Sequence, residues 1–217
     1  MIQAVVFDLD GVLVDSEHVW DAARKDLASE RGRPWPEQAS RDMMGMSSLE
    51  WSSYMHDVVG LPEPPEEISA KVVRRLEEIY RRELPLIDGA VEAIERLAER
   101  WPLGLASSSN RELIDLVLEF SGLARYFVAT VSSEEVPRGK PAPDVYLEAA
   151  RRLGVAPARC AAIEDSENGI RSARAAGMRV LAIPNPRYPP AEEALALADE
   201  VLRSIEELTP ETIERVD

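Results

Sequence analysis

The chain is 217 residues long, with 45% hydrophobic and 30% charged residues, which allows one core carrying a sizeable insertion. Its formal net charge of -15 would repel polyanions, so neither nucleic acid nor an anionic membrane is an expected partner. Cys160 is the only cysteine, so no internal disulfide can form, which is typical of a reducing compartment. The apolar run 2–7 is too short for a membrane span, and we expect a cytoplasmic protein. The sequence carries no signal for an oligomeric state.

The first predicted element is a strand over residues 3–7, an apolar run without polar alternation. Asp8 and Asp10 follow it directly. Side chains two residues apart along an extended chain point the same way, so the two carboxylates can converge, and Gly11 permits a sharp turn. Crowded carboxylates repel each other unless one is protonated or a cation lies between them. Taken alone, such a pair is more often a solvated strand end or a helix cap.

Residues 15–85 contain no convincing strand and at least two strong helical patterns, 17–30 and 66–83. In the second pattern, apolar side chains at helical spacing form a single stripe. A helical insertion placed directly after the first strand would hang over the carboxyl end of the sheet. We therefore predict an α/β core of residues 1–14 plus 86–217 and an all-helical cap of residues 15–85.

Strand and helix signals alternate through the rest of the chain. Ser109 and Glu112 stand at capping-box spacing before one helix, and Gly177 follows the end of another. This alternation predicts a doubly wound, mainly parallel Rossmann-like sheet in an α/β fold. The further predicted strands are 103–106, 127–131, 160–163 and 179–183. The predicted helices are 90–100, 111–120, 143–153 and one that ends at residue 176.

Three more polar groups follow the predicted strands, at the edge where open α/β sheets bind ligands. Ser107 and Ser108 precede a helix whose free amides suit a phosphate oxygen, although serines there are more often caps. Lys140 lies between glycine and proline, which suggests a fixed point charge rather than an accidental surface lysine. Glu164 and Asp165 offer oxygen ligands to Mg²⁺, with capping of the next helix as the alternative. Four such groups in corresponding places are hard to explain as accidents.

These motifs together resemble the haloacid dehalogenase-like hydrolase superfamily, in the branch whose helical cap follows the first strand. That branch includes beta-phosphoglucomutase-like and phosphoglycolate phosphatase-like phosphatases. The resemblance covers nearly the whole chain and implies a Mg²⁺-dependent phosphatase acting on a small phosphorylated metabolite, with a sugar phosphate favoured, through an aspartyl-phosphate intermediate. The matching motifs are residues 8–16, Ser107, Lys140 within 139–144, and 164–170.

The resemblance also implies a role for each matched residue. Asp8 would be the nucleophile, and Asp10 the general acid and then the general base. Mg²⁺ would be held by an oxygen of Asp8, the main-chain carbonyl of Asp10 and the carboxylate of Asp165. Glu164 would either contact the ion or lie directly behind it. The transferred phosphoryl group would be bound by Ser107, Lys140 and backbone amides that include the amide of Ser108.

The predicted cap offers two candidate substrate contacts, Trp20 and Arg41. A sugar ring could stack on Trp20, although a tryptophan there is more often part of a cap core. The sugar-phosphate mutases of this branch carry cationic side chains at three cap positions that match Trp20, Met44 and Ser48 here. Because cations that would hold a second phosphate are missing, hydrolysis is favoured over the alternative of a beta-phosphoglucomutase-like mutase. A non-enzymatic phospho-acceptor similar to a receiver domain is a further alternative, which the cap insertion disfavours.

Overall fold

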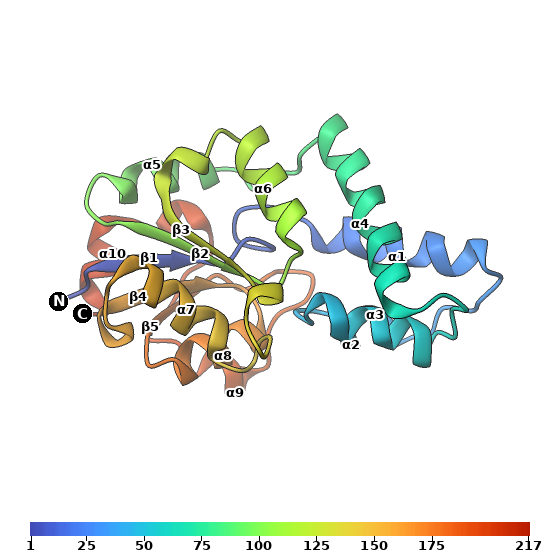
Figure 1. The fold of residues 1–217 in the computed structure, drawn as a ribbon. Helices are drawn as coiled ribbons and strands as arrows, with labels where there is room; N and C mark the ends of the chain where they lie inside the picture. The colour runs from blue at the N-terminus through green and yellow to red at the C-terminus, as the bar shows by residue number, and fades with distance from the viewer.

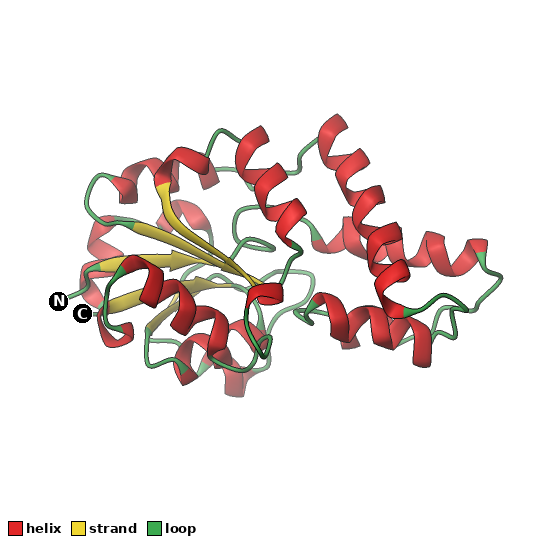
Figure 2. Cartoon of the chain, viewed as in Figure 1, coloured by secondary structure: helices red, strands yellow, loops and turns green.

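A six-stranded parallel sheet forms the centre of the computed structural model, which describes residues 1–217 (Figures 1 and 2). The strand order is β3-β2-β1-β4-β5-β6, so the connections reverse direction between β1 and β4. Open α/β sheets bind ligands outside the carboxyl ends of the strands at such a reversal point. The strands are β1 (Ala4–Phe7), β2 (Leu103–Ser107), β3 (Phe127–Ser132), β4 (Cys160–Glu164), β5 (Arg179–Ala182) and β6 (Glu200–Val201).

Helices cover both faces of the sheet, which is why every residue of its central strands is buried. In β1, Val5 and Phe7 belong to the larger apolar cluster on one face, whereas Ala4 and Val6 belong to the cluster on the other. Helices α5 (Ala90–Ala98), α6 (Arg111–Phe120) and α10 (Pro210–Arg215) supply the first face (Figure 1). Helices α7 (Asp144–Leu153), α8 (Glu167–Ala175) and α9 (Glu192–Leu195) supply the second (Figure 1).

Four helices between β1 and α5 lie beyond the carboxyl ends of the strands (Figure 1). The predicted apolar stripe of the longest one is buried at Ile68, Val72, Leu76 and Tyr80, and this helix packs against the first and third cap helices and against α6 of the core. The apolar core runs without interruption from the sheet into these helices. The exact boundaries of the proposed core and cap stay a prediction. The cap helices are α1 (Glu17–Glu30), α2 (Ala39–Asp42), α3 (Ser48–Asp57) and α4 (Pro65–Arg82).

The predicted capping box of Ser109 and Glu112 is wrong. Helix α6 begins after Asn110, and the amide of Arg111 donates to the carboxylate of Glu134 at 2.9 Å. The hydroxyl of Ser109 donates instead to the side chain of Asp10, at the end of the neighbouring strand. Ser109 therefore belongs to the polar site at the sheet edge and does not cap α6.

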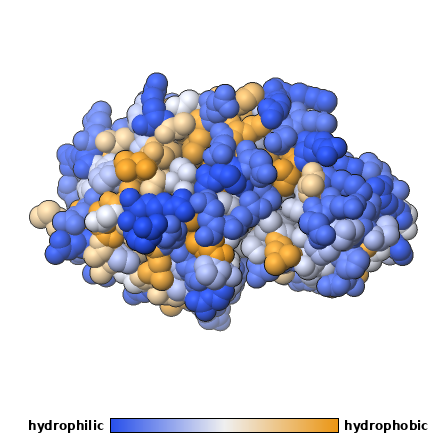
Figure 3. All heavy atoms as spheres, viewed as in Figure 1, coloured by the Kyte–Doolittle hydropathy of each residue, from blue (hydrophilic) through white to orange (hydrophobic).

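The outer surface is mainly hydrophilic on the face shown in Figure 3. Apolar side chains occur there in small separate groups. No helix of the structure combines the length and apolar character that crossing a membrane requires.

Candidate active site

Asp8 lies immediately beyond β1, where its backbone amide still bonds to the carbonyl of Ile163 in β4 at 3.0 Å. The residue is only 6% exposed. One carboxylate oxygen, Oδ1, accepts a hydrogen bond from Nζ of Lys140 at 2.8 Å. The sheet thus fixes the backbone of Asp8 from one side, and Lys140 fixes its carboxylate from another.

Lys140 bridges two carboxylates in the interior of the core. Its Nζ lies 2.8 Å from Asp8 and 2.5 Å from Oε1 of Glu164, although 132 residues separate it from Asp8 in the chain. Burial by itself lowers the pKa of Lys140, but the charges of Asp8 and Glu164 outweigh that effect and the pKa is raised. The two neighbouring carboxylates therefore favour the charged form of Lys140.

Glu164 ends β4 with both carboxylate oxygens occupied by protein donors. Oε1 accepts from Lys140 and from the hydroxyl of Tyr146, the latter at 2.8 Å. Oε2 accepts from the amides of Asp165 and Ser166 and from the hydroxyl of Ser166, at 3.1, 3.3 and 3.1 Å. Five donors leave little capacity for a direct bond to an ion. The arrangement suits an anchor that holds Lys140 and the start of α8 in place.

Asp165 is buried, and no side chain donates a hydrogen bond to its carboxylate. Burial raises its pKa, as do the charges of Glu164 and Asp8. Gly11 makes room for this carboxylate, because a Cβ at Gly11 would lie 1.9 Å from Oδ2 of Asp165. The glycine of the first motif therefore has a steric role besides its positive φ of 77°.

The acids Asp8, Glu164 and Asp165 bring ligand oxygens within 4.8 Å of one another. When all three acids are ionised, the single ammonium of Lys140 leaves a buried excess of two negative charges. Burial also raises the pKa of Asp8 to about 8, against the lowering effect of Lys140. Hard oxygen donors with this charge excess fit a divalent metal ion.

Asp10 faces a group of hydroxyls at the edge of the core. Its Oδ1 accepts from Ser16 at 2.5 Å and from the indole nitrogen of Trp20 at 3.3 Å. Its Oδ2 accepts from Ser109 at 2.6 Å, with Ser107 at 3.5 Å. The carboxylate of Asp10 is thus oriented by donors from both the core and the first cap helix.

The two predicted phosphate-binding serines differ in their surroundings. Ser107 is fully buried at the end of β2, where its oxygen accepts from the amide of Ser109 at 2.9 Å. Ser108 donates to the carbonyl of Gly45 in the cap at 3.2 Å. Asn168 at the start of α8 makes a second such contact, to the carbonyl of Met44 at 3.4 Å. The cap therefore touches the core directly beside the acidic site.

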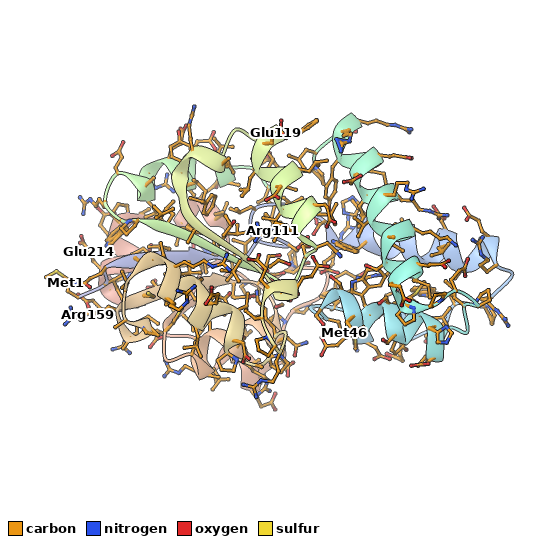
Figure 4. All side chains as sticks on the ribbon, viewed as in Figure 1. Met1, Met46, Arg111, Glu119, Arg159 and Glu214 are labelled. Carbon is orange, nitrogen blue, oxygen red and sulfur yellow. The ribbon has the colours of Figure 1, made fainter.

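A cavity lies beside these contacts, between the core and the cap. On the core side it is lined by Asp8, Asp10, Lys140 and Asp165. Met46, labelled in Figure 4, lines it from the loop between α2 and α3. The remaining cap residues in its wall are Glu17, Trp20, Arg24, Met43, Gly45 and Trp51.

The two candidate substrate contacts of the cap, Trp20 and Arg41, lie in different places. Trp20 lines the cavity but is 5% exposed, with its ring against Trp51 at a centroid distance of 5.7 Å. Arg41 is exposed and lines a different depression, together with Asn168 and Tyr188. An arginine in the short helix α2 therefore does not face Asp8.

Comparison with known proteins identifies the family. Residues 2–177 match the model of the haloacid dehalogenase-like hydrolases. The chain belongs to the haloacid dehalogenase-like hydrolase family. It is 35% identical over 213 residues to a probable pseudouridine-5'-phosphatase from Drosophila melanogaster, covering 95% of this chain and 91% of the relative. It is 34% identical over 215 residues to hexitol phosphatase B from Escherichia coli, covering 96% and 95%.

A solved structure supports the same assignment. CbbY from Rhodobacter sphaeroides in complex with phosphate superposes with a TM-score of 0.87 at 26% identity, covering 99% of this chain and all of that one. This member of the hydrolase family is accordingly a phosphoric monoester hydrolase. The receiver-like alternative is wrong, because the family and its named relatives are enzymes.

Sequence motifs left three neighbours of the site unassigned. Tyr146 reaches Glu164 from α7, Ser16 reaches Asp10 from the start of α1, and Arg24 enters the cavity from α1. Ser16 lies within the first motif, so its proximity to Asp10 could have been inferred. Tyr146 and Arg24 depend on how two helices pack, and nothing in the local sequence distinguishes them from core residues.

Proposed function

We propose that the protein is a Mg²⁺-dependent phosphatase that hydrolyses a small phosphomonoester, with a sugar phosphate as the favoured class. The observation that carries this proposal is the convergence of Asp8, Lys140 and Asp165 in one buried site outside β1. Relatives named as a hexitol phosphatase and a pseudouridine-5'-phosphatase support the substrate class. Cytoplasmic location is part of the same proposal.

In the first step, a carboxylate oxygen of Asp8 attacks phosphorus while the bond from phosphorus to the leaving oxygen breaks. Asp10 donates a proton to that oxygen, so the substrate leaves as an alcohol. The hydroxyls of Ser16 and Ser109 keep the Asp10 carboxyl in a fixed orientation, at 2.5 and 2.6 Å. Asp8 now carries the phosphoryl group.

In the second step, Asp10 takes a proton from a water molecule as the water oxygen attacks phosphorus. The bond between phosphorus and Asp8 breaks, which releases phosphate and restores the carboxylate. Lys140 and Ser107 would bind the phosphoryl oxygens through both steps, together with backbone amides that include the amide of Ser108. The contacts between cap and core beside the cavity would limit the entry of other water.

The metal would be held by Asp8, Asp165 and the main-chain carbonyl of Asp10. When bound, Mg²⁺ would screen the approaching carboxylate from the negative phosphate oxygens. Glu164 would not contact the ion directly, because its two oxygens already accept five protein hydrogen bonds. It would act on the ion only through the residues that it holds in place. Lys140, anchored by Glu164, would then keep its charge beside the phosphoryl group.

Phosphate release from a panel of phosphorylated metabolites tests this function. We expect hydrolysis of one or more sugar or polyol monophosphates with Mg²⁺, and loss of that activity in EDTA with recovery on adding Mg²⁺ back. Glucose 1-phosphate with and without the 1,6-bisphosphate tests the mutase alternative, because a mutase needs the bisphosphate to turn over. Full activity in EDTA, or isomerisation in place of phosphate release, would contradict the proposal.

A further inference from the structure

The cap end of the cavity carries polar groups of its own. Glu17, Trp20 and Arg24 follow one another along α1 at spacings of three and four residues, which places them on one face of the helix. All three line the cavity that also contains Asp8 and Lys140. A substrate whose phosphoryl group reaches Asp8 would therefore have the rest of its structure opposite this face.

Arg24 is a buried cation without a hydrogen-bonding partner. It is 6% exposed, and its Nε lacks any acceptor. No carboxylate oxygen lies within 4.0 Å of its guanidinium nitrogens. The guanidinium carbon lies 4.8 Å from the ring centroids of both Trp20 and Trp51. The faces of these two rings stabilise the positive charge of the guanidinium, but the rings accept no hydrogen bond from its N–H groups.

Glu17 supplies a matching acceptor on the same wall. Its carboxylate accepts no side-chain hydrogen bond, and burial raises its pKa to about 7 against the lowering effect of Arg24. Because Glu17 and Arg24 form no salt bridge, each keeps its hydrogen-bonding capacity for a third group. A hydroxyl can accept from a guanidinium and donate to a carboxylate at once. A second phosphate would instead be repelled by the ionised form of Glu17 and would meet only one cation.

We propose that Arg24 and Glu17 bind hydroxyl groups of the alcohol part of the substrate, with Arg24 donating and Glu17 accepting. The pair would select a polyhydroxylated monophosphate over a bisphosphate. This inference rests on the proposed function, which places the phosphoryl group on Asp8. Trp20 and Trp51 then hold the guanidinium of Arg24 in position, a different role from stacking on a sugar ring.

The test compares Arg24→Met with wild type on two substrates. One is the best polyhydroxylated monophosphate of the panel above, and the other is para-nitrophenyl phosphate, whose leaving group has no further hydroxyl. We expect the ratio of the two kcat/KM values to fall roughly 10- to 100-fold, as for the loss of a hydrogen bond to a charged donor. The loss should appear mainly in KM. Glu17→Met should lower the same ratio.

Lys25→Met is the matched control, because Lys25 is the next residue of α1 and points to solvent, where it pairs with Asp21. It should leave the ratio unchanged. If Arg24→Met does not fold, Arg24→Lys keeps the charge but loses the forked donors, and it should lower the ratio as well. An equal loss on both substrates would overturn the inference and assign Arg24 a structural role.

Two further outcomes separate this inference from the proposed function. Wild-type protein that hydrolyses para-nitrophenyl phosphate but prefers fructose 1,6-bisphosphate to every hydroxylated monophosphate would overturn the inference and leave the phosphatase intact. Wild-type protein that releases phosphate from none of these compounds would overturn the proposed function itself.

Discussion

At the scale of single residues, the charge balance of the site depends on Lys140. It is buried between Asp8 and Glu164, whose charges raise its pKa despite the opposing effect of burial. With Asp165 included, the site holds three acids and one base. An uncompensated buried charge is costly, so a divalent cation is the group that would restore the balance.

Binding of Mg²⁺ should release protons near neutral pH. Burial raises the pKa of Asp8 to about 8, and burial with neighbouring charges also raises that of Asp165, so the metal-free site holds protons that a cation displaces. Apparent Mg²⁺ affinity should therefore rise between about pH 6 and pH 8. Calorimetric titration in two buffers of different ionisation enthalpy measures the number of protons released.

The raised pKa of Asp8 also makes the stability of the metal-free protein depend on pH. The unfolded chain releases the proton of Asp8 near its ordinary pKa of 3.8, whereas the metal-free folded protein keeps it to about pH 8. Stability from this group is full below the lower value and is lost as the pH rises through the higher one.

Asp165→Asn should reduce the number of protons released when Mg²⁺ binds. Identical binding heats in both buffers would contradict the shift.

At the scale of structural elements, the start of α8 is built around a carboxylate. The side chain of Glu164 folds back over the first turn, and a Cβ at Gly169 would lie 1.8 Å from its Oε1. Ser166 caps the helix by accepting from the amide of Gly169 at 3.1 Å while it donates to Glu164. In residues 164–170, the helix cap and the acidic site were alternative interpretations, but Ser166 caps α8 while it also donates to Glu164, so both are present.

Gly169→Ala should therefore damage the site although alanine favours helices. The added methyl would displace Glu164 and with it Lys140, and a displacement of about 1 Å near reacting groups can cost on the order of 100-fold in rate. We expect a fall of roughly 10- to 100-fold in kcat/KM for phosphate release. Gly154→Ala is the control: its Cβ would meet nothing within 4 Å, so only stability should fall, by about 1 kcal/mol for its positive φ. Equal activities of both variants would argue against this role of Glu164.

Elements with strong local signals were predictable from the sequence. The expected ranges 17–30 and 111–120 coincide with α1 and α6, because each helix carries apolar side chains at helical spacing on one face. The sequence analysis did not predict β6, which has two residues, α2, which has four, or the longer helix α3, which has ten. The two short elements form where neighbouring structure supplies hydrogen bonds and cover, which no local apolar pattern records.

Some contacts of the site were likewise predictable from the sequence, and others were not. The approach of Lys140 and Glu164 to Asp8 was predictable, because strand ends of a parallel sheet meet at one edge. The contact of Tyr146 with Glu164 was not, since it depends on the rotation of α7 against the sheet. Arg41 was placed near the site by its position in the chain, but α2 turns it toward a different depression.

At the scale of the whole molecule, a strongly acidic protein encloses a site for an anionic ester. The net charge is -15, and contacts of Ser108 with Gly45 and of Asn168 with Met44 join the cap to the core beside the cavity. Long-range repulsion opposes the approach of a phosphomonoester dianion, whereas Lys140 and a bound cation attract it only at short range.

Salt should therefore increase the rate of substrate capture. At saturating Mg²⁺, we expect kcat/KM to rise by a factor of a few, and by less than about tenfold, as KCl increases to about 0.1 M, where the screening length is about 10 Å. The kcat at saturating substrate should change much less. Initial rates at low substrate concentration measure the effect. A steady fall of kcat/KM with salt would show that the local positive field dominates.

The central claim is that Asp8 itself receives the phosphoryl group. In Asp10→Asn the first step can still occur with a good leaving group, but the second step lacks its base, so the intermediate should accumulate. Mass spectrometry of this variant after incubation with para-nitrophenyl phosphate and Mg²⁺ should show the added mass of one phosphoryl group, mapped to the peptide that contains Asp8. The double variant with Asp8→Asn should gain none. A phosphoryl group on another residue, or an unmodified Asp10→Asn protein that still releases phosphate at the wild-type rate, would contradict the account.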